Sequence, residues 1–318
     1  MKREVYREVL GLLSELPFGA CPNVGLLRSR YPGIAVETFI SIYSQEIQYK
    51  VIKSNHIHKS RVEEYLARYM AGEDLLLLSA AINFPCCLLL RRMLESLLRV
   101  HKQSISDVLR NPSLLPTLLD VDDSCNPAQQ RNPGASPGPS SQATSGEGGA
   151  PVKPAVSAHF LARLQLDVAR SSLADCSYSP YADIAKQATG VEFELLLAEK
   201  LKAAGLDYFW TEDDLRNQGY YKTPDVRLQV PIAVRDKRAH PHGDGWRIVT
   251  WIDSKATFGD DRTHTKQYEE QYSTYVNRYG PGLIIYWFDF IEDLDTDAEV
   301  MIMNRFPDAD ELAQLTSL

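Results

Sequence analysis

Two aspartates and a lysine lie at the ends of two strand-like segments of the sequence. Asp225 follows Pro224 at the start of TPDVRLQV, while Asp253 and Lys255 close WRIVTWIDSK. Aspartate is depleted within strands, so strand propensity does not explain either acid. Two neighbouring carboxylates repel each other unless a cation lies between them, and oxygen ligands of this kind suit Mg²⁺. The residues therefore predict a magnesium site for phosphoryl chemistry, with Lys255 beside the attacking water or the charge that develops on the phosphate.

The elements that must position these residues are two strands over 224–232 and 246–255, paired as an antiparallel hairpin. Such a hairpin brings Asp225 next to Asp253. Period-two alternation predicts Val249, Trp251, Asp253 and Lys255 on one face of the second strand. For the Asp253-Ser254-Lys255 triplet considered alone, a surface salt bridge is the alternative interpretation.

Two helices flank the predicted hairpin. The first, over about 179–204, carries Gly190 and Glu194, and Glu194 is expected to point towards the sheet edge. The second contains Gln271 and Tyr275, one turn apart, and leads into the apolar strand GLIIYWF. The predicted order is helix, three strands, helix and strand, which favours an α/β or α+β domain.

The chain before residue 122 shows strong helical signals and no strand signals. A helix up to Ala81, a turn over 82–84 and a second helix from Pro85 have the layout of a helix-turn-helix, and a similar pair surrounds the turn at 31–34. A plain helical bundle is the alternative. Cys86, Cys87 and Leu88 occupy the first turn, where recognition helices usually contact bases, so packing or protein binding is favoured there. His56 and His58 are expected in a solvated connection.

Composition separates the chain into three predicted parts. Residues 123–157 are rich in Pro, Gly and Ser and are expected to form a disordered linker between a helical region at 1–122 and a domain at 158–318. Residues 1–120 carry 15 Lys and Arg against 12 Asp and Glu, within a net charge of −8 for the whole chain. An acidic C-terminal half can still act on phosphodiesters if metal ions supply positive charge.

Five cysteines without a CxxC pair support neither a disulfide framework nor a zinc site. No membrane span or signal peptide is expected, which predicts an intracellular protein.

The order of these motifs resembles the PD-(D/E)xK nuclease superfamily. Pro224-Asp225 resembles its PD motif, Asp253-Ser254-Lys255 its (D/E)xK motif, Gly190 with Glu194 its first-helix motif, and Gln271 with Tyr275 the Q-x-x-x-Y of archaeal Holliday-junction resolvases. The segments KTPDVRLQVPIAV, WIDSKATFGD and NRYGPGLIIYW are similar to the codanin-interacting nuclease family. The resemblance implies a restriction-endonuclease-like αβββαβ core with a mixed sheet, preceded by an all-α helix-turn-helix region.

The resemblance also implies a metal-dependent DNA nuclease with a codanin-like partner, linked to chromatin and histone handling in the nucleus and cytoplasm. Asp225, Asp253 and the Ser254 carbonyl would hold Mg²⁺, with Mn²⁺ as a substitute. Lys255, Glu194 and Gln271 would complete the catalytic set, and Arg227 and Tyr275 would contact DNA, branched or structured DNA included. Two alternatives remain: a nuclease-fold protein that binds codanin with little or no turnover, and a DNA regulator that uses the helical pairs.

Overall fold

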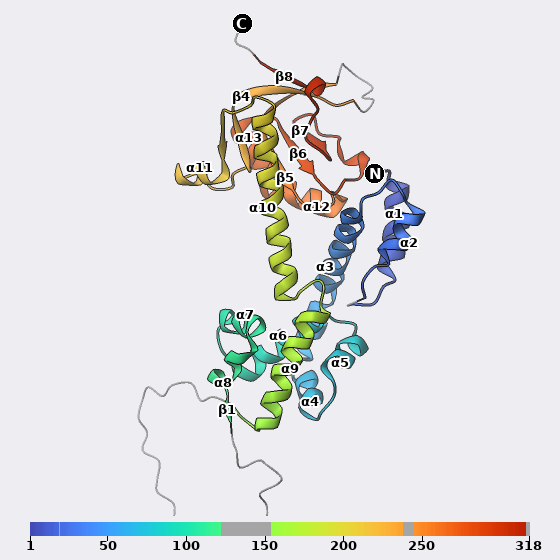
Figure 1. Ribbon diagram of the computed structural model, residues 1–318, viewed down its shortest axis with the longest axis vertical. Helices are drawn as coiled ribbons and strands as arrows, with labels where there is room; N and C mark the ends of the chain where they lie inside the picture. The colour runs from blue at the N-terminus through green and yellow to red at the C-terminus, as the bar shows by residue number, and fades with distance from the viewer. Residues whose placement is uncertain (19, 122–153, 238–244, 316–318) are drawn as a thin grey trace, which may run out of the picture. The chain divides into compact units, whose positions relative to one another are not determined.

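The computed structural model describes residues 1–18, 20–121, 154–237 and 245–315, which form two compact units (Figure 1). One unit comprises Met1–Leu16, Pro22–Ile47 and Ala185–Leu318, and the other comprises Pro17–Cys21 and Gln48–Ile184. Each unit therefore combines segments from both sides of the predicted linker, whereas the sequence boundaries follow the chain in order. That linker, 123–157, lies outside the described residues except for 154–157.

The first unit contains a mixed six-stranded sheet with the order β3-β4-β5-β6-β7, and β8 pairs with β4. The strands are β3 (Phe209–Thr211), β4 (Val226–Arg235), β5 (Trp246–Lys255), β6 (Gly282–Tyr286), β7 (Val300–Met303) and β8 (Leu312–Gln314). Pairing is antiparallel for β3 with β4, β4 with β5 and β4 with β8, and parallel for β5 with β6 and β6 with β7. The predicted mixed sheet with an α/β core is confirmed, as is the hairpin of β4 and β5. The sequence prediction did not include β7 and β8.

Helices flank this sheet in chain order. They are α10 (Pro180–Ala203), α11 (Glu212–Asn217), α12 (Asp261–Gln267), a π-helical turn η3 (Tyr268–Tyr272), α13 (Ser273–Tyr279), and the short 3-10 turns η4 (Glu292–Leu294) and η5 (Ala309–Glu311). Leu197 and Leu201 of α10 pack in one core with Val226 and Ile252, and Tyr275 of α13 packs with Trp251 in another core. Neighbouring strand residues point to opposite faces, so α10 and α13 cover opposite faces of the sheet.

A register shift interrupts the β4–β5 hairpin. Val226 lies opposite Ile252 and Arg227 opposite Trp251, but the next pair is Ile232 with Val249. Val249 consequently packs in the same core as Ile252, so the predicted alternation, which grouped Val249 with Trp251, is wrong at that position. The alternation resumes at Trp251, which leaves Asp253 and Lys255 on the face that α13 covers.

The joint between β5 and β6 depends on a glycine. A Cβ atom at Gly282 would lie 2.1 Å from the ring of Trp251, so no other residue type fits there without displacing the tryptophan. The indole nitrogen of Trp251 donates to the Gly280 carbonyl at 2.8 Å. This close packing fixes the end of β5 that carries Asp253 against the neighbouring strand.

Helices from the start of the chain also belong to the sheet unit: α1 (Arg3–Ser14), α2 (Val24–Arg30) and part of α3 (Val36–Ser60). Tyr6 stacks on Phe258 with 5.4 Å between ring centroids. The backbone nitrogen of Phe258 donates to the Ser41 hydroxyl, and the Gln45 amide donates to the Phe258 carbonyl. These contacts hold the segment that directly follows Lys255.

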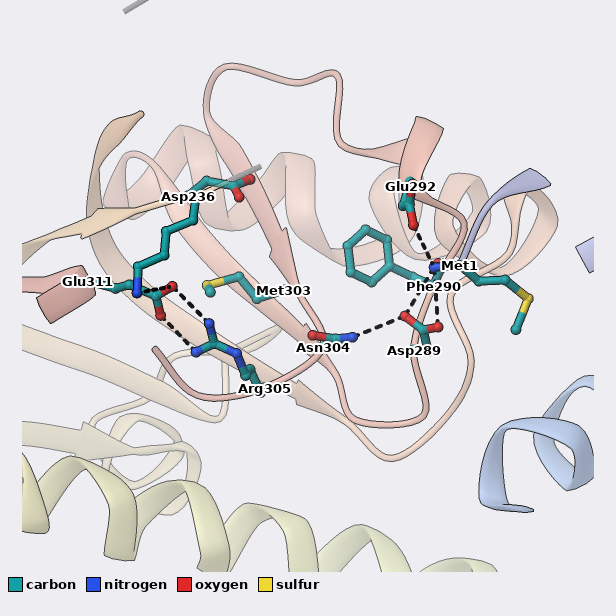
Figure 2. Close-up of a pocket in the computed structure, with 10 residues that line it drawn as sticks. Met1, Asp236, Asp289, Phe290, Glu292, Met303, Asn304, Arg305 and Glu311 are labelled. Carbon is teal, nitrogen blue, oxygen red and sulfur yellow. Dashed lines mark hydrogen bonds and ion pairs between the residues drawn. The ribbon is translucent and has the colours of Figure 1, made fainter. Parts of the chain in front are cut away.

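A polar pocket in this unit contains paired charges (Figure 2). The Met1 ammonium donates to the Phe290 carbonyl at 2.7 Å and lies 3.2 Å from Asp289. Lys237 and Arg305 both pair with Glu311, whose side chain is 1% exposed. Because these cations pair with carboxylates of the pocket itself, we interpret the pocket as a structural cluster.

Replacing Glu311 with glutamine is expected to lower the free energy of unfolding by about 2 kcal/mol at pH 7. Bidentate hydrogen bonds from Arg305 lower the pKa of Glu311 to about 2. A depressed carboxyl pKa stabilises the fold above the unfolded pKa of about 4.3, and the stabilisation disappears as the pH falls towards 2. Denaturant unfolding at several pH values tests this: the gap between wild type and Glu311→Gln should close in acid, and the exposed control Glu299→Gln should show no gap. Equal stability at pH 7 would contradict the assignment.

The second unit is mostly helical. It contains α4 (Val62–Met70), α5 (Leu75–Ile82), α6 (Cys86–Leu98), α7 (Lys102–Arg110), the turn η1 (Pro112–Leu114), α8 (Leu115–Leu118), α9 (Ala158–Ala174), and one short parallel pair, β1 (Asp120–Val121) with β2 (Ala155–Val156). The predicted absence of strands before the linker is therefore wrong at β1. The predicted helical pair is present as α5 and α6, and the chain bends by 108° between them. Asp74 caps α5, and Asn83 adopts a left-handed conformation between the two helices.

The first turn of α6 is buried within the helical unit. Cys86 and Cys87 are buried and Leu88 is half-buried. This supports the packing role predicted for these positions. His58 corrects another prediction, because it lies buried in α3 and shares a hydrogen bond with the Tyr65 hydroxyl instead of lying in a solvated connection. No single helix among the described residues is long and apolar enough to cross a membrane; the bent pair of α5 and α6 passes this test jointly.

Candidate active site

The β4–β5 pairing places Asp225 opposite Asp253. Val226 pairs with Ile252 across the antiparallel hairpin. Asp225, just before Val226, therefore faces Asp253, just after Ile252. One carboxylate oxygen of Asp225, Oδ2, accepts a hydrogen bond from the Ser254 backbone nitrogen at 2.7 Å. Asp225 thus binds the backbone of the strand end that carries Asp253 and Lys255.

Burial and mutual repulsion make it costly to keep both acids ionised. Asp253 is 1% exposed and Asp225 is half-buried. Burial raises the pKa of Asp225 well above its usual range, and the charge of Asp253 raises it further. Burial lowers the pKa of Lys255, but the charges of Asp253 and Asp225 outweigh this effect and leave the pKa raised. Lys255 is therefore held as a cation beside two carboxyl groups.

The buried oxygen Oδ2 of Asp253 meets the Lys255 ammonium. The two atoms form an ion pair at 2.5 Å, and no other donor among the described residues meets this oxygen. A buried carboxylate oxygen without a donor is costly unless a cation meets it. Two carboxyl groups, those of Asp253 and Asp225, thus share the single cation of Lys255, and their oxygens form a donor set that fits Mg²⁺.

Gln271 lies close to the lysine. It belongs to the π-helical turn η3, an irregularity that is frequent at functional sites. The Lys255 ammonium donates to its side-chain oxygen at 3.5 Å. The structure therefore brings Asp225, Asp253, Lys255 and Gln271 together, as the sequence predicted.

Tyr275 has a different environment from the one expected for a DNA contact. It is 3% exposed, packs edge-on against Trp251, and donates from its hydroxyl to the Thr223 carbonyl at 2.8 Å. Thr223 and Pro224 are buried and directly precede Asp225. This geometry supports a positioning role for Tyr275, which holds the loop that presents Asp225.

Tyr275→Phe is accordingly expected to lower the free energy of unfolding by about 1 kcal/mol, because it deletes one buried hydrogen bond and leaves the ring packing intact. Any catalytic effect should be small and should come from a displaced Asp225. Thermal unfolding beside the exposed control Tyr208→Phe measures the first effect. A variant as stable as wild type would show that the hydroxyl does not anchor the loop.

Arg227 lies two residues beyond Asp225 on β4 and is stacked between aromatic rings. Its guanidinium carbon lies 4.8 Å from the ring centroid of Trp210 and 4.9 Å from that of Tyr279. Because alternate strand residues share a face, Arg227 and Asp225 lie on the same side of β4. The position is compatible with a phosphate contact close to the acids.

Glu194 is the third acid that the sequence predicts for this site. It is an exposed residue of α10, but partial desolvation of its carboxyl group raises its pKa, and the charges of Glu212 and Asp253 raise this pKa further. Among the described residues, the metal-ligand trio whose ligand atoms lie within 4.8 Å of one another is Cys86, Cys87 and Asp175. Glu194 therefore does not complete a close acidic trio with Asp225 and Asp253 here.

Glu212 and Trp287 also lie at the site, although neither was predicted from the sequence. The carboxyl group of Glu212 accepts from the Thr223 hydroxyl at 3.4 Å and contributes to the electrostatics of Glu194 and Lys255. The Trp287 indole donates to the Ser254 hydroxyl at 2.8 Å. The Glu-Asp-Asp run at the start of α11 was a usable signal for Glu212. Nothing in the sequence pattern linked Trp287 to Ser254.

The trio in the helical unit has a structural explanation. The Asp175 carboxylate accepts hydrogen bonds from the backbone nitrogens of Cys87, Ser177 and Tyr178. It therefore caps the start of α6 and closes its own turn. With its oxygens engaged in this way, the trio gives no evidence of a metal site.

Comparisons with known proteins assign relatives to almost the whole chain. Residues 161–306 match the family described as "Protein of unknown function TPD sequence-motif". The chain is 34% identical to CDAN1-interacting nuclease 1 of Xenopus laevis, over 97% of this chain and 89% of that protein. It is 32% identical to the protein of that name from Homo sapiens, over 88% of this chain and 86% of that protein. The Danio rerio protein of that name is 32% identical over 96% and 89%. No solved structure matches the chain.

Proposed function

The chain belongs to the CDAN1-interacting nuclease 1 family, and from this membership we propose that it is a metal-dependent nuclease that hydrolyses phosphodiester bonds in DNA. The observation that carries the proposal is the pair of carboxyl groups of Asp225 and Asp253, buried together beside the single cation of Lys255. The proposal includes a restriction-endonuclease-like core of the PD-(D/E)xK type, which the αβββαβ order and the motif positions support.

In this proposal Asp225, Asp253 and the Ser254 carbonyl would hold Mg²⁺ or Mn²⁺. The bound ion would supply a more acidic water and neutralise charge that develops on the phosphate. Asp225 and Asp253 need their ionised form to bind a cation, and the charge of Lys255 lowers the pKa of Asp225 and so favours its ionised form. The hydrogen bond from the Ser254 backbone nitrogen to the Asp225 carboxylate holds Asp225 beside the end of β5.

Lys255 would act as a charge and a donor. Since its pKa is raised, it stays protonated at neutral pH and cannot accept a proton from water without first losing its own. It would instead donate to the attacking water or to a phosphate oxygen and stabilise the transition state. Gln271 would orient the ammonium group through its side-chain oxygen.

Further parts of the proposal concern substrate, partner and place. The relatives are named as nucleases that interact with CDAN1, so we assign a codanin-like partner to this chain as well. Arg227 would contact a phosphate close to the acids, and Glu194 would join the acidic cluster if substrate binding closed α10 onto it. Branched or structured DNA as substrate, and action in both nucleus and cytoplasm, complete the proposal.

The test is cleavage of single-stranded, duplex, flap and four-way-junction DNA by the full chain. The proposal expects cleavage with Mg²⁺ or Mn²⁺ that stops when a chelator is added. Absence of cleavage on every substrate with either metal would contradict it.

A second candidate is a nuclease-fold protein that binds codanin with little or no turnover. The observation in its favour is the exposed Glu194, which leaves the acidic set open. The positions at the start of α6 that a recognition helix would use to contact bases are buried, which argues against DNA docking by this helix. The metal dependence of cleavage separates the two candidates.

A further inference from the structure

Aromatic side chains gather beside the loop that leads to Asp225. Tyr220 and Tyr221 are 40% and 72% exposed, although aromatic rings of this size usually bury most of their surface. Tyr220 meets Tyr279 edge-on with 6.4 Å between ring centroids. Trp210 lies across β3 and β4 from Arg227 and is half-buried.

Two arginines lie between these rings. The guanidinium carbon of Arg278 lies 5.3 Å from the ring of Tyr221, 5.5 Å from that of Tyr279 and 5.9 Å from that of Tyr220. Arg227 stacks between Trp210 and Tyr279. We call this set the tyrosine–arginine platform: Trp210, Tyr220, Tyr221, Tyr279, Arg227 and Arg278.

Among the residues that the structure describes, no acidic side chain pairs with the platform cations. In the described part of the chain, neither arginine has a carboxylate within ion-pair distance, and the nearby Glu212 pairs with Arg216 instead. Arg278 donates from one nitrogen to the carbonyls of Tyr221 and Lys222. Its guanidinium carries five donors, so several stay available for an anion.

The backbone beneath the platform is strained. Lys222 is exposed and adopts a left-handed conformation with φ 50°, which costs of order 1 kcal/mol for a residue other than glycine. Arg278 and Tyr275 hold this loop through the carbonyls of residues 221 to 223. The fold thus keeps the two tyrosines, the Lys222 cation and Asp225 within one short, anchored segment.

We propose that the tyrosine–arginine platform binds unpaired nucleotides of a single DNA strand and guides the adjoining phosphate to Asp225 and Asp253. Tyrosine faces stack on bases that are not paired, and unpaired guanidinium groups bind phosphates. Paired bases inside a duplex cannot present their faces to Tyr221, so the surface favours single strands. The inference rests on the proposed function, because it assigns the substrate class of the same site.

Binding of a fluorescent thymidine oligomer to the full chain in EDTA tests the inference without cleavage. Tyr221→Ala should weaken binding about tenfold, within the range for loss of one base–aromatic stack, and Tyr221→Trp should restore it. Tyr181→Ala, at a tyrosine that is 60% exposed elsewhere, should bind as wild type. A duplex of the same length should show no dependence on Tyr221. Thermal unfolding confirms that each variant is folded.

Three outcomes would overturn the platform: no binding of the oligomer by wild type, equal binding by wild type and Tyr221→Ala, or equal weakening on single strand and duplex. These outcomes are distinct from failure of the proposed function. Wild type that cleaves DNA with metal but shows no Tyr221 effect contradicts the platform alone. Absence of cleavage by wild type contradicts the proposed nuclease function. The binding measurement still decides whether the platform binds single strands.

Discussion

Asp253→Asn is expected to reduce DNA cleavage on the order of a thousandfold or more while leaving the protein folded. Asp253 is buried, faces Asp225 across the hairpin and pairs with the Lys255 ammonium. The amide keeps the size of the side chain but removes the charge that would hold a divalent cation. It also removes the repulsion that raises the pKa of Asp225, and Lys255 keeps Asp225 as its counter-charge, so the unfolding midpoint without metal should not fall.

Single-turnover cleavage with saturating Mg²⁺, with thermal unfolding of the same samples, measures both effects. Asp310→Asn is the matched control, because Asp310 is an exposed acid of the same unit that pairs with Lys237. Cleavage by Asp253→Asn at the wild-type rate would remove Asp253 from the site. If Asp253→Asn lost both cleavage and the fold, Asp225→Asn, measured in the same way, would decide whether the two acids form the site.

Lys255→Met is expected to separate metal binding from cleavage. Without the ammonium, charge on the phosphate in the transition state loses its nearby donor, and cleavage should fall on the order of a hundredfold or more. Metal binding should persist or strengthen, because the cation that pairs with Asp253 is gone. Without metal, the two acids lose their counter-charge, and the free energy of unfolding should fall by about 3 kcal/mol. Added Mg²⁺ should recover much of this loss.

Cleavage kinetics and thermal unfolding with and without Mg²⁺ measure these effects. Lys202→Met provides the control, since it removes an exposed lysine from α10 in the same unit. If Lys255→Met bound metal and cleaved DNA as wild type, Lys255 would be only a structural partner of Asp253. That result would favour the salt-bridge interpretation of the triplet.

The hairpin was predictable because its signals are local. Period-two alternation, the proline at a strand start and the acid-x-lysine triplet placed both strands and both acids, and β5 has the predicted bounds of 246–255. Cross-strand pairing then follows from antiparallel geometry. Gln271 was found from its position one helical turn before Tyr275 and from the resemblance, and its contact with Lys255 agrees with that expectation.

Tertiary packing set the features that the sequence did not predict. The register shift between Arg227 and Ile232 moved Val249 to the face of Ile252, and no residue pattern announced it. A tyrosine on a helix can present its hydroxyl to solvent or to DNA. The Tyr275 ring instead packs in the core against Trp251, which itself packs tightly over Gly282 of β6. The residues next to His58 in the sequence are polar, as in a loop. A hydrogen bond to Tyr65 and a ring contact with Phe84 nevertheless keep the His58 side chain buried.

Calorimetric titration of Mg²⁺ and Mn²⁺ into the wild type and into Asp225→Asn is the most direct test of the central claim, which is that Asp225 and Asp253 form a divalent metal site. The account predicts saturable binding by the wild type at millimolar metal or below, and its loss in Asp225→Asn. Absence of binding by the wild type at millimolar metal, or equal binding by the variant, would contradict it.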